Sequence, residues 1–178
     1  MYRTHTCGEL TAKNIWETVK ICGWTNKLRN LWWMTFIDLR DRYGVTQITV
    51  DPKKIDIDAM DIKSEYVLQI EGKVIARPDS MINKNMKTWE VELDPIDIKV
   101  LSKSDVLPFP IVDEPNTSEE QRFKYRYLDL RRKKVLDNVE FRTRMAMFTR
   151  DRFTQRNFFE VQTPIFTVSS PEWARDYL

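Results

Sequence analysis

The sequence predicts a mainly β protein that opens with a five-stranded barrel. Two observations carry this prediction. Residues 34–40 and 45–50 alternate apolar and polar side chains on either side of a turn, as the half-buried strands of a hairpin do. Five β-rich runs also follow one another, with a short helical stretch between the third and the fourth. That is the order of elements in an OB-fold barrel.

Each element has its own signal in the sequence. The turn at residues 41–44 ends in Gly44, which can take a positive φ. Gly72 lies in the middle of a long β-rich run, which predicts a bulge or a sharp bend at that point. The remaining elements are expected at residues 19–24 (first strand), 55–62 (short helix), 66–76 (fourth strand), and 89–93 with 96–101 (last strand).

A change of composition separates the barrel domain, residues 1–103, from the rest of the chain. Pro108, Pro110 and Pro115 lie close together among acidic residues, which is typical of a linker. We therefore expect a linker or hinge at residues 104–133.

A second domain is expected to begin at residue 134. Residues 135–157 contain neither glycine nor proline, and their apolar side chains are spaced roughly as one helical face. Residues 158–166 are expected to form a strand, with Pro164 near its end. Residues 134–178 thus hold one long helix and one strand of an α+β domain.

Composition excludes several classes of protein. The net charge of +2 over 178 residues is too small to indicate nucleic-acid binding by itself. Cys7 and Cys22 make neither a disulfide framework nor a metal site, and a single histidine, His5, argues against a His-based metal site or a Ser-His-Asp triad. No apolar run is long enough to span a membrane and no signal peptide is evident, so we expect a cytoplasmic protein.

The chemistry of the barrel is expected on the outer face of its first three strands. OB-folds bind oligonucleotides there, using cations for phosphates and aromatic rings for bases. Residues 26–30 supply cations and amides, and Gln47 can donate and accept towards a base edge. If Ile37 and Leu39 line the core, Phe36 faces outward as a stacking platform. A register shifted by one residue would instead place Phe36 in the core, and the pattern alone favours neither.

Several stretches of the chain are similar to bacterial aspartyl-tRNA synthetases. Together they extend over essentially the whole chain, and the ending Pro-Glu-Trp-Ala-Arg-Asp-Tyr-Leu argues against a lysyl or asparaginyl relative. The stretches are residues 22–24, 35–42, 124–132, 163–165, 170–172 and 174–178.

The resemblance implies a role for particular residues. Arg29, Phe36, Gln47 and Glu92 match the positions at which the family contacts the anticodon of tRNA(Asp). Asn30 and Asn83 are weaker candidates that we expect on the same face.

The resemblance also implies an architecture for the second domain. Residues 135–166 are similar to the first signature of the class II catalytic domain, a helix-strand unit that forms the homodimer interface in the family, with the motif proline at Pro164. Glu172 matches a residue that contacts the substrate aspartate. The implied activity is ATP- and Mg²⁺-dependent attachment of aspartate to tRNA. The signatures for ATP, Mg²⁺ and the aspartate pocket would lie beyond Leu178, so we expect the 178 residues alone to be inactive and to bind no cofactor. The alternative is a non-catalytic OB-fold module that binds tRNA or other single strands.

Five tryptophans depart from the family pattern, because they stand where the family typically has glycine. They are Trp16, Trp32, Trp33, Trp89 and Trp173. We interpret them as the product of a UGA codon that encodes glycine in the source organism, with deliberate engineering as the alternative.

Overall fold

The computed structural model describes residues 2–31, 33–78, 82–83 and 86–164. The chain divides into two compact units, Met1–Pro108 and Phe109–Leu178. Pro164 is the last described residue, so Glu172, which the resemblance assigns to aspartate binding, lies outside the described residues, as do Trp32 and Trp173.

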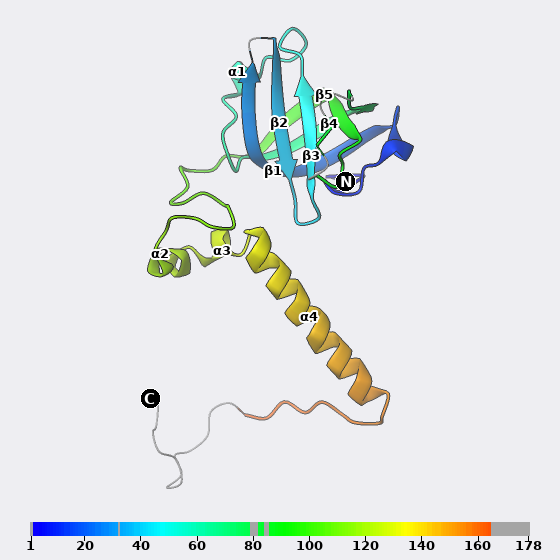
Figure 1. Cartoon of the computed structure of the whole chain (residues 1–178), viewed down its shortest axis with the longest axis vertical. Helices are drawn as coiled ribbons and strands as arrows, with labels where there is room; N and C mark the ends of the chain where they lie inside the picture. The colour runs from blue at the N-terminus through cyan, green and yellow to red at the C-terminus, as the bar shows by residue number, and fades with distance from the viewer. Residues whose placement is uncertain (1, 32, 79–81, 84–85, 165–178) are drawn as a thin grey trace. The chain divides into compact units, whose positions relative to one another are not determined.

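The first unit is a closed five-stranded barrel, which confirms the predicted OB-fold (Figure 1). The strand order is β1-β2-β3-β5-β4, with β3 and β5 parallel at the closure and the other pairs antiparallel. The short helix α1 lies between β3 and β4 in the chain, as predicted. The elements are η1 (Ala12–Asn14), β1 (Thr18–Leu31), β2 (Met34–Arg40), β3 (Val45–Val50), α1 (Ile57–Met60), β4 (Val67–Ala76) and β5 (Val91–Ser102).

β1 is longer than the sequence predicts, because its two halves pair with two different strands. Residues 18–24 pair with β4, and residues 24–31 pair with β2. A register shift between Thr25 and Lys27 lies just after the changeover. Such bulges bend a strand, and here the bend lets β1 turn a corner of the barrel. The polar segment at residues 26–30 is therefore strand and not loop.

The barrel core confirms the predicted alternation. Ile37, Leu39, Ile48 and Val50 are fully buried. Gly72 lies at a register shift between β4 and β5, as predicted. A Cβ atom at Gly72 would come within 2.5 Å of the backbone oxygen of Asp94, so only glycine allows β5 to approach this closely.

The described part of the second unit contains three helices: α2 (Glu119–Lys124), α3 (Arg126–Asp129) and α4 (Lys133–Thr154). α4 confirms the predicted long helix with ends shifted by two or three residues. α2 and α3 lie within the stretch expected to be a linker. Ser118 caps α2 by accepting a hydrogen bond from the backbone N–H of Gln121, and Glu119 and Glu120 occupy the first turn.

The strand predicted at residues 158–166 is wrong for its described part. Residues 158–164 have no regular structure, and no strand of the described chain pairs with them. A strand is stabilised by a hydrogen-bonded neighbour, which the alternation of side chains alone does not supply. Instead the chain folds back on α4: the Phe158 N–H donates to the Phe153 carbonyl at 3.1 Å, and Arg150 pairs with Glu160 at 2.9 Å. Pro164 is exposed in this irregular segment.

Candidate nucleic-acid interface

The barrel gathers four of the residues singled out from the sequence on the outer face of its sheet. Strand pairing places Arg29 opposite Phe36 and Asp38 opposite Gln47. The parallel pairing of Ile48 with Leu93 brings Glu92 beside Gln47. We refer to Arg29, Phe36, Asp38, Gln47 and Glu92 as the outer-face cluster.

Hydrogen bonds join the polar members of the outer-face cluster in a chain. Arg29 Nη2 donates to Asp38 Oδ1 and to Gln47 Oε1, both at 3.2 Å. Gln47 Nε2 in turn donates to Glu92 Oε2 at 3.1 Å. A guanidinium group only donates and a carboxylate group only accepts, so the amide of Gln47 has one orientation that satisfies both neighbours.

Phe36 lies on the outer side of β2, with its neighbour Ile37 fully buried in the core. Of the two registers that the sequence left open, the structure has the one in which Phe36 faces outward. Phe36 is nevertheless only 8% exposed. The guanidinium group of Arg29 lies 5.5 Å from the ring centroid, in cation–π geometry, and covers it. The Phe36 ring therefore lies on the outer face, but the guanidinium group of Arg29 covers it.

Asn30 does not join the outer-face cluster, contrary to expectation. It pairs with Thr35 and not with Phe36. Because successive side chains of a strand point to opposite faces, the side chain of Asn30 points to the face of β1 opposite to that of Arg29. Asn83 is exposed, and its backbone carbonyl accepts a hydrogen bond from the Met86 N–H at 3.0 Å.

Two charged residues, Asp38 within the outer-face cluster and Arg77 beside it, were not among the sequence candidates. Asp38 has its side chain largely buried beneath Arg29, and its outward position follows from the same alternation as that of Phe36. Arg77 directly follows β4 and is 4% exposed. It donates to the Val91 carbonyl at 3.3 Å, and its Nε has no acceptor among the described residues. Burial lowers the pKa of Arg77, and the charges of Glu92 and Asp38 oppose that shift.

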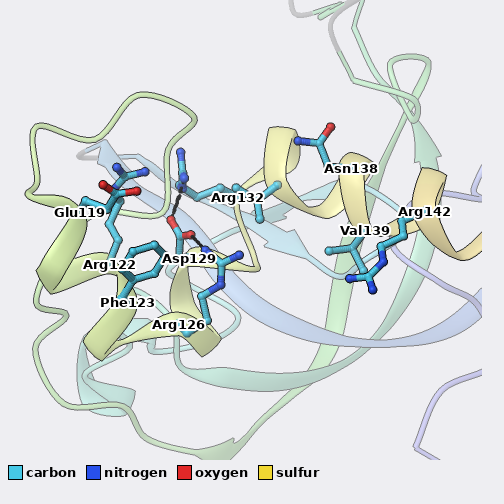
Figure 2. Close-up of a pocket in the computed structure, with 10 residues that line it drawn as sticks. Glu119, Arg122, Phe123, Arg126, Asp129, Arg132, Asn138, Val139 and Arg142 are labelled. Carbon is cyan, nitrogen blue, oxygen red and sulfur yellow. Dashed lines mark hydrogen bonds and ion pairs between the residues drawn. The ribbon is translucent and has the colours of Figure 1, made fainter. Parts of the chain in front are cut away.

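A pocket of about 340 Å³ lies in the second unit, among α2, α3 and the first half of α4. Figure 2 shows Arg126 and Arg132 reaching the carboxylate of Asp129 from two sides. Arg132 also donates to the Asp113 carbonyl at 2.6 Å. Both Asp129 and Arg132 are buried, so this ion-pair group fixes the turn between α3 and α4. Within the motif at residues 124–132, Arg126, Asp129 and Arg132 thus stabilise the fold of the second unit.

The described residues include no helix that is long and apolar enough to cross a membrane.

Two family models match the chain, one on each unit. Residues 19–101 match the OB-fold nucleic acid binding domain, and residues 118–178 match tRNA synthetases class II (D, K and N).

Relatives of known name match the chain over its whole length. The chain is 45% identical to an aspartate–tRNA(Asp/Asn) ligase of Treponema denticola, over 100% of the chain and 31% of the relative. It is 44% identical to an aspartate–tRNA ligase of Mycoplasma mycoides, over 100% of the chain and 30% of the relative. The chain therefore spans about 30% of the length of these relatives.

Solved structures share the fold at low sequence identity. The aspartyl-tRNA synthetase of Entamoeba histolytica has a TM-score of 0.80 at 21% identity, over 93% of this chain and 41% of that one. The asparaginyl-tRNA synthetase of Pyrococcus horikoshii has a TM-score of 0.76 at 22% identity, over 93% of this chain and 38% of that one.

Proposed function

We propose that the chain is part of an aspartyl-tRNA synthetase and that its barrel binds the anticodon loop of tRNA(Asp), because of its similarity to the aspartate–tRNA ligases and its match to the OB-fold nucleic acid binding domain. The observation that carries the proposal is the outer-face cluster, where Arg29, Phe36, Gln47 and Glu92 lie together on the face that OB-folds use for oligonucleotides. Cations, an aromatic ring and polar groups of fixed orientation are what single-stranded RNA recognition requires.

Each residue of the proposed interface has a distinct role. Phe36 offers a ring on which a base stacks, once Arg29 moves aside or lies on the far side of that base. Arg29 supplies a cation for a phosphate or a base oxygen. Gln47 and Glu92 supply hydrogen-bonding groups for base edges, and their mutual bond holds them in one orientation.

The proposal is tested by titrating the 178-residue chain with a tRNA(Asp) anticodon stem-loop. Stacking on an aromatic side chain contributes about 1–3 kcal/mol per base. Phe36→Ala is therefore expected to weaken binding by roughly 5- to 150-fold. Ile96→Ala is the matched control, because Ile96 is an exposed apolar residue of β5 on the same barrel. An affinity for the stem-loop no higher than for a hairpin with a scrambled loop would refute anticodon binding. An unchanged affinity of Phe36→Ala would remove Phe36 from the interface.

For the whole protein we propose aspartate–tRNA ligase activity, with ATP and Mg²⁺ as in the family and homodimerisation through the region that includes Pro164. Glu172 is proposed to contact the aspartate, and the protein is proposed to act in the cytoplasm. Within the described residues no three His, Cys, Asp or Glu side chains come together as a metal site. We propose that catalysis is carried out by parts of the protein other than the described residues.

A further inference from the structure

Asp38 is the member of the outer-face cluster that neither the sequence motifs nor the comparisons assign to a role. It carries the carboxylate nearest to Arg29, at 3.2 Å, and is 15% exposed where Arg29 is 44% exposed. Its side chain therefore lies beneath the guanidinium group. An RNA phosphate approaching this face would meet Arg29 first.

Arg29 has many rotatable bonds and is half in solvent, so by itself it would sample many conformations. Its bond to Asp38 holds the guanidinium group where the same nitrogen also donates to Gln47 Oε1. The carboxylate thus fixes a cation over the Phe36 ring, and the cation fixes the amide of Gln47 from the side opposite to Glu92. Every polar group that faces a base in the proposed interface is held, directly or through a neighbour, by Asp38.

We propose that Asp38 is a positioning residue for base recognition: it holds Arg29 and, through Arg29, the hydrogen-bonding orientation of Gln47. This inference rests on the proposed anticodon binding and deepens it. Asp38 itself contacts no base, and its role is to make the interface discriminate between bases.

Removal of the Asp38 carboxylate distinguishes the positioning role from an electrostatic role and from a purely structural role, because each role predicts a different change in RNA affinity. A carboxylate on an RNA-binding face repels phosphates, so its removal alone would strengthen binding to every RNA. Loss of positioning weakens binding to the correct RNA only. A purely structural role weakens binding to every RNA and lowers the thermal stability.

The test compares Asp38→Asn with the unaltered 178-residue chain. Fluorescence anisotropy measures the Kd for the tRNA(Asp) anticodon stem-loop, for three stem-loops with one anticodon base replaced in each, and for a scrambled hairpin. For Asp38→Asn we expect about 5- to 10-fold weaker binding of the correct stem-loop, while the scrambled hairpin binds equally well or up to about twofold more tightly. The ratio of the Kd for the altered stem-loops to the Kd for the correct stem-loop falls accordingly.

Two further variants serve as controls. Asp97→Asn removes the same charge from β5 of the same barrel, where Asp97 is exposed and pairs with Lys99, and it should keep the discrimination of the unaltered chain. Asp38→Glu restores the carboxylate on a longer side chain and should recover part of the discrimination.

The outcomes separate this inference from the proposed function. If the unaltered chain binds the correct stem-loop no more tightly than the scrambled hairpin, both fail. If the unaltered chain discriminates and Asp38→Asn discriminates equally well, the positioning role alone is overturned. A parallel loss of affinity for all RNAs with a lower Tm would also overturn it, in favour of a structural role.

Discussion

At Trp16 the backbone takes a conformation that favours glycine. Its φ is 76°, the side chain is 70% exposed, and the backbone N–H donates to the Val74 carbonyl at 2.8 Å. The left-handed region costs a residue with a Cβ atom roughly 1–2 kcal/mol. This observation supports the interpretation that glycine is the native residue at this position. Trp89, by contrast, is partly buried and is not among the residues with positive φ, so among the described tryptophans the structure supports glycine independently only at Trp16.

A pair of variants tests the strain at Trp16. Replacement by glycine and replacement by alanine both remove the ring and its contact with the Lys73 ammonium group, 4.8 Å away. Only glycine relieves the backbone. We expect Trp16→Gly to exceed Trp16→Ala in free energy of unfolding by about 1 kcal/mol, measured by urea denaturation. Alanine is normally the more stabilising of the two, so a more stable Trp16→Ala would show that the positive φ imposes no strain.

The outer-face cluster shows how far single residues could be predicted. Alternation along the strands places Phe36 and Gln47 outward once Ile37 and Ile48 are known to be buried, but the sequence pattern alone left the register of Phe36 open. The covering of Phe36 by Arg29 could not be predicted, because it depends on the register between β1 and β2 after the bulge at Thr25 and Lys27. The same register places Asn30 on the other side of the strand. Arg77 follows the end of β4, where the alternation no longer says which side chains are buried.

Among the elements, strands could be predicted where the residues of the strand themselves alternate between apolar and polar or are rich in β-forming residues. β2, β3 and β4 have clear alternation or β-rich runs, and their observed bounds lie within one residue of the prediction. The missed helix α2 carried a capping signal in Ser118 with Glu119 and Glu120, which the nearby prolines obscured. The strand expected at residues 158–166 had a suitable composition but no partner among the described residues.

The close contact of β4 and β5 at Gly72 gives a prediction for the barrel. Gly72→Ala brings a methyl group within 2.5 Å of the Asp94 oxygen and 2.9 Å of Pro95 Cα, both backbone atoms that cannot rotate away. We expect a loss of about 2–3 kcal/mol in the free energy of unfolding, measured by chemical denaturation. Thr18→Ala, at the exposed start of β1, is the control and should cost less than about 1 kcal/mol. A loss at Gly72 no greater than at Thr18 would mean that β5 moves freely away from β4.

At the scale of the molecule, the two units differ in how their apolar residues are covered. Met1–Pro108 encloses a continuous core that includes Leu10, Ile21 and Leu93. In α4, no residue is buried, although Met145, Phe148 and Phe153 were predicted as part of an apolar face. The long helix thus follows from its local sequence, while the partner for its apolar residues is not among the described residues.

This difference predicts unequal stability along the 178-residue chain. Isolated helices are marginally stable in water, since most helical stability in proteins comes from packing of an apolar face. Barrel strands lose their hydrogen bonds only when the core opens. We therefore expect the amides of α4 to exchange with deuterium at least a hundredfold faster than those of β2 and β4, measured by mass spectrometry at neutral pH. Residues 1–108 produced alone serve as the control, because their amides should keep the slow exchange they have in the longer chain. Protection of α4 equal to that of β4 would contradict the argument, since it would require that the apolar side chains of α4 be packed as firmly as the barrel core.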